Sequence, residues 1–335
     1  MKHFKRLLAI SLALLLLFGL AACGEEKDVP RTPVPVAYDG AQITIALSGT
    51  AADYGLLKLL DNETYRISAS DSFGDSMSSD LSVVPLWFAA EQIAAGKDLR
   101  IVAVNSFGLL SVVASDSGIQ GVKALDGKTV YAGSAYPANA DAVSGTFDFS
   151  EKAMRELFSK YGVTAAAEYR ETVSLYEEVL AGKTQIAVLP EPYASLAAVK
   201  SNAQFAFTLT DAWTDAGEKV PFVESCIVAK ASFVENNADG LRRFLADLRA
   251  SVEWVNLHPV DAVNLLIEKE MADADILTVD SQLSEKKQEA AKQQQAIDLI
   301  SRSNPVVIDG EDMKAPIALQ SYAYDIPDEA IFILK

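Results

Sequence analysis

Cys226 and His258 are the residues of this chain that could pair as a nucleophile and a base. The sequence has two cysteines and two histidines, and the other member of each kind lies within its first 23 residues. A thiol needs a base or a cation close by to react near neutral pH, and His258 stands at an expected helix start before Pro259. Two of each residue also exclude zinc sites built from three histidines or from four cysteines. We therefore expect no catalytic residue, no metal and no cofactor, and we interpret Cys226 as a buried small apolar side chain.

A second group of residues fits binding. Aromatic, hydroxyl and acidic side chains stand in short segments that follow expected strands, and these segments contain no Lys or Arg. Aromatic rings stack on flat or cationic groups, so the set favours a neutral or cationic ring over a strong anion. The candidate ligand-binding residues are Ser48, Thr50, Tyr54, Pro85, Trp87, Phe107, Ser134, Tyr136, Glu191 and Tyr193. A second role stays open for the set: aromatic rings also pack in cores, and carboxylates such as Glu191 and Asp53 also stabilise helix starts.

The first 23 residues have the layout of a secretion signal. Lys2, Lys5 and Arg6 precede a 14-residue apolar run, and the run closes on Leu20-Ala21-Ala22-Cys23-Gly24. The run is short for the ~20 apolar residues that cross a bilayer, so an uncleaved membrane helix is the less favoured interpretation. A cysteine directly after small residues resembles the lipobox of bacterial lipoproteins. We expect residues 1–22 to be a signal peptide, with Cys23 lipidated and 23–37 a proline-rich tether.

The elements that must position these residues alternate in type. Runs rich in β-branched residues predict strands at 42–47, 65–70, 81–84, 100–105, 109–115, 129–132, 168–170, 185–189 and 205–210. Helical patterns lie between them at 151–161, 175–181 and 192–200, and three longer ones follow at 239–257, 259–269 and 284–303. Such alternation is typical of parallel α/β sheets covered on both faces. Open α/β sheets bind ligands beyond the carboxyl ends of their strands, where the candidate segments lie.

The composition and charge indicate a folded protein and exclude one class of partner. The 335 residues are 50% hydrophobic and 22% charged, values typical of a folded domain, and the formal charge is −17. An acidic chain lacks the concentrated basic surface that phosphate backbones require, so we expect no nucleic-acid partner.

Four motifs in order resemble the substrate-binding proteins of ABC importers in the nitrate/sulfonate/taurine/thiamine-precursor family. They are Ser79–Pro85 (SDLSVVP), Val102–Gly108 (VAVNSFG), Leu125–Val130 (LDGKTV) and Leu189–Tyr193 (LPEPY). Trp254, His258, Pro259 and Ala262 are similar to the family's W-x-x-x-(H/N)-P-x-x-A helix pair. The likeness extends from about Gln42 to Ile331. Two departures stand out: the segment between Tyr136 and Ser150 is longer and more acidic than the family's loop, and Ser48-Gly49-Thr50 lacks its frequent Gly-Pro or Gly-Tyr start.

The resemblance implies an α/β, two-lobed periplasmic-binding-protein fold of type II, with two connecting hinge strands and a ligand cleft between the lobes. We expect lobe 1 at 38–115 plus 225–335 and lobe 2 at 116–224. The crossings are expected near Ser111–Gly118 and Val220–Lys230.

The resemblance also implies a function. We expect a monomeric solute-binding lipoprotein, anchored by lipid on the outer face of the cytoplasmic membrane or in the periplasm, that delivers a small molecule to an ABC permease with a cytoplasmic ATPase. Two alternatives share the architecture. One is an enzyme of thiamine-pyrimidine or menaquinone biosynthesis, disfavoured by the lipobox and the scarcity of His and Cys, and the other is an orphan surface sensor.

Overall fold

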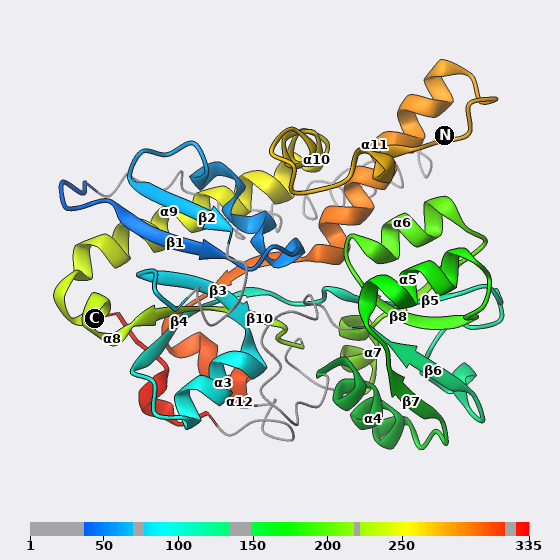
Figure 1. Ribbon diagram of the computed structural model, residues 1–335, viewed down its shortest axis with the longest axis horizontal. Helices are drawn as coiled ribbons and strands as arrows, with labels where there is room; N and C mark the ends of the chain where they lie inside the picture. Colours follow the sequence, from blue (N-terminus) through cyan, green and yellow to red (C-terminus); the bar gives the residue numbers. More distant parts are fainter. Residues whose placement is uncertain (1–36, 70–76, 134–148, 218–221, 319–325, 335) are drawn as a thin grey trace, which may run out of the picture. The chain divides into compact units, whose positions relative to one another are not determined.

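A computed structural model describes residues 37–69, 77–133, 149–217, 222–318 and 326–334, all within one compact unit, Pro35–Lys335. The described strands form two sheets, each with helices on both faces (Figure 1). The predicted α/β class is therefore confirmed. Among the described residues, no helix combines the length and apolarity needed to cross a membrane.

The first sheet has the strand order β11-β4-β10-β3-β1-β2. Its strands are β1 (Ile43–Leu47), β2 (Tyr65–Ala69), β3 (Leu81–Pro85), β4 (Leu99–Ser106), β10 (Ser225–Lys230) and β11 (Pro305–Ile308). β1 runs parallel to β2 and β3, whereas β10 is antiparallel to β3 and β4. All five residues of β3 are buried, as expected for a strand covered on both faces.

The second sheet has the order β7-β6-β8-β5-β9. Its strands are β5 (Leu110–Ala114), β6 (Thr129–Ala132), β7 (Ala166–Tyr169), β8 (Ile186–Pro190) and β9 (Gln204–Thr208). β6 is parallel to β7 and β8, and β5 is antiparallel to β8 and β9.

The two sheets have a similar strand order, and each contains one strand that follows, in the chain, an element of the other lobe. β5 follows β4 in the chain after only Phe107–Leu109, yet it lies in the second sheet between β8 and β9. β10 follows α7 and lies in the first sheet at the equivalent place, between β3 and β4. Each lobe is thus completed by a strand that arrives from the other lobe. This is the two-lobed type II fold that the sequence predicts.

The first crossing lies earlier than expected. The expected lobe 1 includes residues 110–114, with a crossing at 111–118, but these residues pair with β8 and β9 of the second sheet. The sequence of an apolar strand does not show which of the two sheets it joins, because the strand would be buried on both faces in either sheet. The described chain passes between the sheets over Phe107–Leu109.

Helices cover each face of each sheet (Figure 1). On the first sheet, one face carries η1 (Ala51–Leu59), α9 (Ala238–Leu257) and α10 (Pro259–Glu268), and the other carries α3 (Leu86–Ala94), η4 (Gly310–Met313) and α12 (Lys314–Ala318). α8 (Ala231–Asn236) contacts β4, β10 and α9. On the second sheet, α5 (Thr172–Leu180) and α6 (Tyr193–Lys200) face away from η2 (Val122–Leu125), α4 (Phe149–Tyr161) and α7 (Leu209–Asp215). The remaining described helices are η3 (Ala274–Leu277), α11 (Glu285–Ser303) and η6 (Asp328–Ala330).

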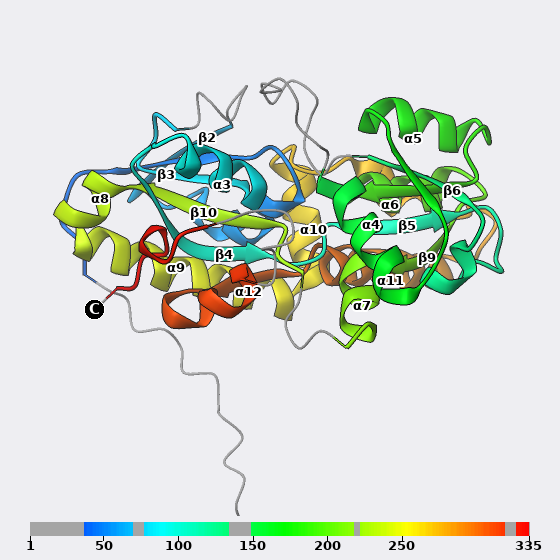
Figure 2. The same ribbon diagram turned by 90° about the horizontal axis from the view of Figure 1, so that it is seen from below.

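The C-terminal segment packs on the first sheet. Phe332 N donates a hydrogen bond to Ile101 O of β4 at 2.9 Å, and Ile331 forms a bridge with Ile101. In Figure 2 this red segment lies beside β4 and β10. The last described residues thus lie along β4, at the first sheet.

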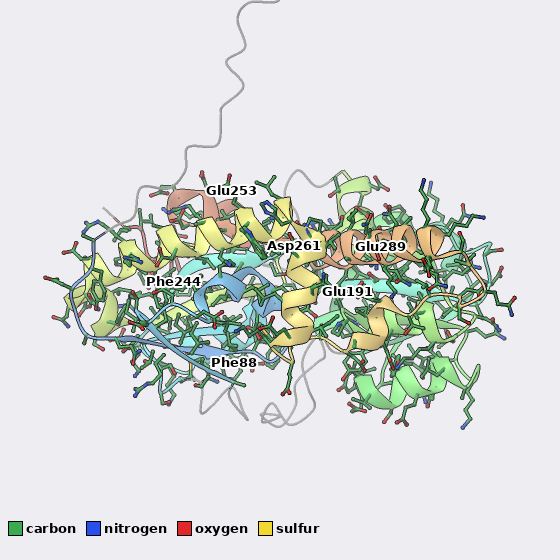
Figure 3. The ribbon with its side chains drawn as sticks, turned by 90° about the horizontal axis from the view of Figure 1, so that it is seen from above. Phe88, Glu191, Phe244, Glu253, Asp261 and Glu289 are labelled. Carbon is green, nitrogen blue, oxygen red and sulfur yellow. The ribbon has the colours of Figure 1, made fainter. Side chains whose placement is uncertain are left out.

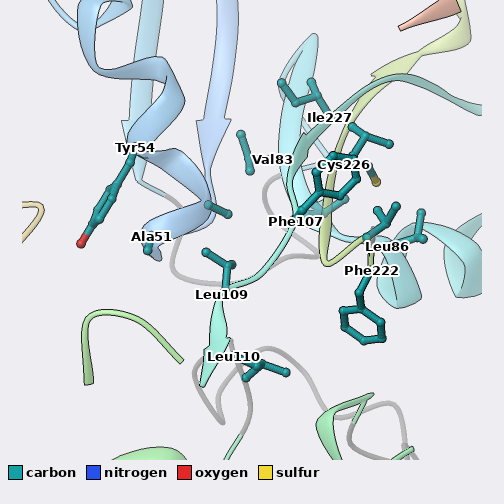
Figure 4. Packing of buried hydrophobic residues seen from close by; sticks show 14 of the residues in the cluster. Ala51, Tyr54, Val83, Leu86, Phe107, Leu109, Leu110, Phe222, Cys226 and Ile227 are labelled. Carbon is teal, nitrogen blue, oxygen red and sulfur yellow. The ribbon is translucent and has the colours of Figure 1, made fainter. Parts of the chain in front are cut away.

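Apolar side chains fill the junction where the chain crosses between sheets (Figure 4). Leu109 and Leu110 are fully buried, and Phe222 and Cys226 of the return segment pack in the same core. Burial raises the pKa of the Cys226 thiol. The interpretation of Cys226 as a buried apolar residue is confirmed, because it is free and fully buried.

Candidate functional site

The carboxyl end of β1 holds two of the candidate residues, Ser48 and Thr50, around the Asp53 carboxylate. Thr50 caps η1, accepting a hydrogen bond from Ala52 N at 3.2 Å, and the Asp53 carboxylate accepts from Thr50 N, so the capping box expected from the sequence is formed. The Ser48 hydroxyl lies 2.9 Å from the Thr50 hydroxyl. The Asp53 carboxylate also accepts from Ser48 N and Gly49 N. The segment 48–50 is therefore organised by a side chain three residues beyond it.

Asp53 is only 1% exposed, and burial raises the pKa of its carboxyl to about 6. The hydrogen bonds from Ser48, Gly49 and Thr50 act in the opposite direction, because they stabilise the ionised form, but desolvation outweighs them.

Tyr54 reaches from η1 toward the second lobe. Its side chain is fully buried, and within the described residues its hydroxyl has no hydrogen-bond partner. Burial raises the pKa of this phenol, and the negative charges of Glu191 and Asp53 raise it further. Figure 4 shows the Tyr54 hydroxyl pointing away from Phe107 and Leu109. The structure thus brings Tyr54 and Glu191, two candidates from different lobes, into one electrostatic environment.

Glu191 follows β8 and is bound by two donors. Its Oε1 accepts from Arg302 Nε at 2.6 Å, and its Oε2 accepts from Ser195 N in the first turn of α6 at 3.2 Å. The Glu191 side chain is fully buried, and its backbone N donates to Leu109 O of the crossing segment at 2.8 Å. Figure 3 shows Glu191 close to α11.

Arg302 is the residue of this cluster that the sequence analysis missed. It comes from α11, and it also donates to the Ser195 hydroxyl at 2.8 Å and stacks on the Phe205 ring at 3.7 Å. The candidate segments contain no cation of their own, and no local pattern links a helix near the C-terminus to the end of β8. Lys200 of α6 and Asp275 of η3 form a second ion pair nearby, at 2.6 Å.

The ends of β3 and β4 are largely packed. Pro85 is buried at the start of α3, and Trp87 is half-buried with its ring edge-on to Phe88, the centroids 5.8 Å apart. Phe107 is only 4% exposed, and its carbonyl accepts from the Thr210 hydroxyl at 3.3 Å. Of these aromatic candidates, Trp87 keeps the larger exposed surface.

Tyr193 opens α6 and packs on Tyr176 of α5, with ring centroids 5.3 Å apart. Burial raises the pKa of Tyr193, and the charge of Glu171 adds to that effect. The candidates Ser134 and Tyr136, and the lipidation candidate Cys23, lie outside the described residues.

His258 and Cys226, the residues that could pair as a base and a nucleophile, lie in different surroundings. His258 is exposed at the start of α10, with its ring stacked on Trp254, whereas Cys226 is buried in β10. Within the described segments, no group of three or more His, Cys, Asp or Glu side chains could hold a metal ion.

Two pockets lie next to these residues. One of about 490 Å³ opens at the carboxyl ends of β1 and β2, between η1 and the end of α10. It is lined by Leu47, Gly49, Thr50, Asp53, Leu60, Asp61, Ala69, Lys269, Glu270 and Met271. The other, of about 630 Å³, lies between α6 and the η3–α11 segment and includes Ser195 and Arg302.

Comparison with solved structures identifies the class of fold. No protein-family model matches the sequence, and no curated protein matches it either. An ABC transporter from Parabacteroides distasonis superposes with a TM-score of 0.63 at 17% identity, over 88% of this chain and 97% of that one. The ligand-binding component of an ABC-type import system from Staphylococcus aureus gives 0.58 at 12% identity, over 88% and 96%.

A third solved structure is the alkanesulfonate-binding protein SsuA from Xanthomonas axonopodis pv. citri. It has a TM-score of 0.56 at 13% identity and covers 85% of this chain and 92% of that one. The chain therefore has the fold of ABC-transporter substrate-binding proteins, and the resemblance expected from the sequence is confirmed at the level of fold.

Proposed function

We propose that this protein captures a small molecule between its two lobes and delivers it to an ABC importer. The observation that carries the proposal is the strand exchange: β5 and β10 each complete the sheet of the other lobe. As a result, the carboxyl end of β8 meets the crossing segment after β4, where Glu191 N donates to Leu109 O. Ligands of open α/β sheets bind at such strand ends.

Capture in this proposal involves no chemical step. The ligand binds to one lobe, and rotation about the crossing segments buries it against the other, in the manner of hinge closure. The closed form then docks on a membrane permease whose ATPase drives release. The binding proteins among the solved neighbours support this function, because they share the fold over most of their length.

The lipid anchor belongs to the same proposal. The segment Leu20-Ala21-Ala22-Cys23-Gly24 and the proline-rich stretch after it support a monomer tethered through Cys23 outside the cytoplasm. Several acyl chains hold a protein on a membrane stably, whereas one chain binds only marginally.

The ligand proposed is a neutral or cationic ring. Trp87 offers a half-buried aromatic face at the end of β3, and the candidate loops themselves carry no cation. Arg302, a cation from α11 that lies next to these loops in the fold, already pairs with Glu191.

We also propose limits for the two lobes: 38–109 plus 225–335 for lobe 1 and 110–224 for lobe 2. The end of the first segment of lobe 1 moves from 115 to 109, because β5 pairs with β8 of the second sheet.

A ligand screen tests this function. The full-length protein, purified in detergent, is heated with pyrimidines, thiamine, riboflavin, amino acids, taurine, alkylsulfonates or nitrate, and unfolding is followed by the fluorescence of its three tryptophans. A ligand at 100 times its dissociation constant adds about 2.7 kcal/mol to the free energy of unfolding. A shift for one chemical class supports the proposal. No shift with any compound, and no small molecule released by denaturing the purified protein, would favour an orphan surface protein.

A further inference from the structure

Three successive backbone N–H groups at the end of β1 converge on one carboxylate. Ser48 N donates to Asp53 Oδ1 at 3.0 Å, and Gly49 N and Thr50 N donate to Oδ2 at 2.7 and 3.2 Å. Successive N–H groups arranged in this way form a concavity that binds anions. In this chain the anion is the protein's own side chain.

The concavity borders a cavity large enough for a small molecule. Gly49, Thr50 and Asp53 line the pocket of about 490 Å³ at the carboxyl ends of β1 and β2. Asp53 is itself 1% exposed, because its carboxylate is taken up by the three N–H groups. An oxyanion at this end of the pocket therefore finds these hydrogen-bond donors already occupied.

Other acidic side chains also accept from backbone N–H groups. Glu171 accepts from two successive groups, Val173 N and Ser174 N, at the start of α5. Glu224 and Glu191 each accept from a single one, Leu109 N and Ser195 N.

The residue after Asp53 adds a polar atom with no partner. The Tyr54 hydroxyl is fully buried, has no hydrogen-bond partner within the described residues, and lies in the field of Asp53 and Glu191. The negative charges of Asp53 and Glu191 therefore act on the same side chain of η1, and like-charge repulsion disfavours a further negative charge beside them.

We propose that Asp53 is a specificity-determining residue: its carboxylate is a built-in occupant of the oxyanion site at the end of β1, so that this protein rejects oxyanions and accepts neutral or cationic ligands. This inference rests on the proposed solute-binding function and names the charge class of the solute. It predicts that removing the carboxylate converts the end of β1 into an anion site.

The test measures binding of methanesulfonate and sulfate to the full-length protein and to Asp53→Ala. Both probes are small oxyanions, and chloride at matched ionic strength controls for salt effects. The expected result is no saturable binding to the unchanged protein by calorimetry or tryptophan fluorescence. Asp53→Ala should unfold at a lower temperature, and either probe should restore that temperature in a saturable way, with at least a tenfold gain in affinity.

Two further variants keep the test decisive. Asp53→Ser removes the charge and leaves a smaller side chain that does not reach all three N–H groups, so it serves if the alanine variant does not fold, and it should also gain oxyanion binding. Glu168→Ala removes one exposed negative charge from β7, away from the pocket around Asp53, and should gain no binding at that pocket. A gain equal to that of Asp53→Ala would mean a nonspecific charge effect and would overturn the inference.

The outcomes separate this inference from the proposed function. Tight binding of methanesulfonate or sulfate to the unchanged protein would overturn the role of Asp53 and leave solute capture intact. Failure of both Asp53 variants to bind either oxyanion would also overturn it. If no compound of any class binds the unchanged protein while the Asp53 variants gain oxyanion binding, the solute-binding function fails and the occupied anion site stands.

Discussion

Arg302 and Glu191 form an ion pair between residues that are 111 positions apart, with Nε and Oε1 separated by 2.6 Å. Arg302 belongs to α11, which contacts α9 and η1 on the first sheet, and Glu191 follows β8 of the second. The pair therefore connects the lobes outside the two strand crossings. Because the Glu191 side chain is fully buried and that of Arg302 is 16% exposed, the pair is largely shielded from water.

Removing Arg302 is expected to destabilise the fold strongly. Arg302→Met keeps an apolar contact with Phe205 but leaves the Glu191 carboxylate buried with only Ser195 N as a donor. A buried charge that loses its partner costs about 3–5 kcal/mol, measurable by urea unfolding. The double variant Glu191→Gln/Arg302→Met should recover part of this loss, because no charge is left unpaired.

An exposed ion pair provides the control for Arg302→Met. Arg242 and Asp239 lie 2.8 Å apart with side chains 43% and 80% exposed. Arg242→Met should cost at most about 1 kcal/mol, as is usual for surface pairs. Equal losses for Arg302→Met and Arg242→Met would contradict the connecting role of Arg302.

Stability is expected to depend on pH through Asp53. Its pKa is raised from 3.8 to about 6 in the folded protein, so the folded state holds the proton more tightly than the unfolded chain does. The contribution of Asp53 to stability is therefore greatest below pH 4 and falls as the pH rises from about 4 to about 6, by up to about 3 kcal/mol.

The measurement compares urea unfolding of the unchanged protein and Asp53→Asn at pH 4, 5, 6 and 7. The difference between the free energies of unfolding of the two proteins isolates the contribution of Asp53. The amide introduced by Asp53→Asn does not titrate, so the unchanged protein should lose stability relative to the variant across this range. A difference that is constant with pH, or that moves the other way, would show that the hydrogen bonds to Asp53 outweigh its burial.

Trp87→Ala is expected to abolish ligand binding and leave the fold intact. The Trp87 side chain is half-buried and packs edge-on against Phe88. Its removal therefore takes away a surface that would contact the ligand and leaves most of the core packing in place. With the ligand found by the screen, the affinity should fall at least tenfold, which corresponds to about 1.4 kcal/mol. Trp254→Phe, at the turn before α10, is the matched control and should bind normally. Unchanged affinity of Trp87→Ala would remove Trp87 from the site.

Cys23→Ser is expected to release the protein from the membrane. Serine cannot carry the thioether-linked lipid that the segment before Gly24 predicts. The variant should move from the detergent phase to the aqueous phase in a detergent-partition experiment, while Cys226→Ser should stay in the detergent phase. Retention of Cys23→Ser in the detergent phase would indicate a membrane-spanning leader instead of a lipid.

The local features of this protein could be predicted from its residues alone. Strand and helix patterns follow from the periodicity of apolar residues, and the capping box of Thr50 and Asp53 depends on residues three positions apart. The burial of Cys226 followed from the lack of any partner for its thiol. These signals are local, so they survive in a single sequence.

The tertiary structure decided which distant residues meet. Judged by its sequence, Leu110–Ala114 could have joined either sheet, because the apolar pattern of a buried strand does not specify which strands pair with it. The pairing of Arg302 with Glu191 depends on how α11 reaches the end of β8, a contact between charges that sequence periodicity does not encode. The hydrogen bonds from Ser48 N and Gly49 N to the Asp53 carboxylate could be identified only in the folded structure. A hydrogen bond requires direction and distance as well as residue type, and the sequence specifies only the residue type.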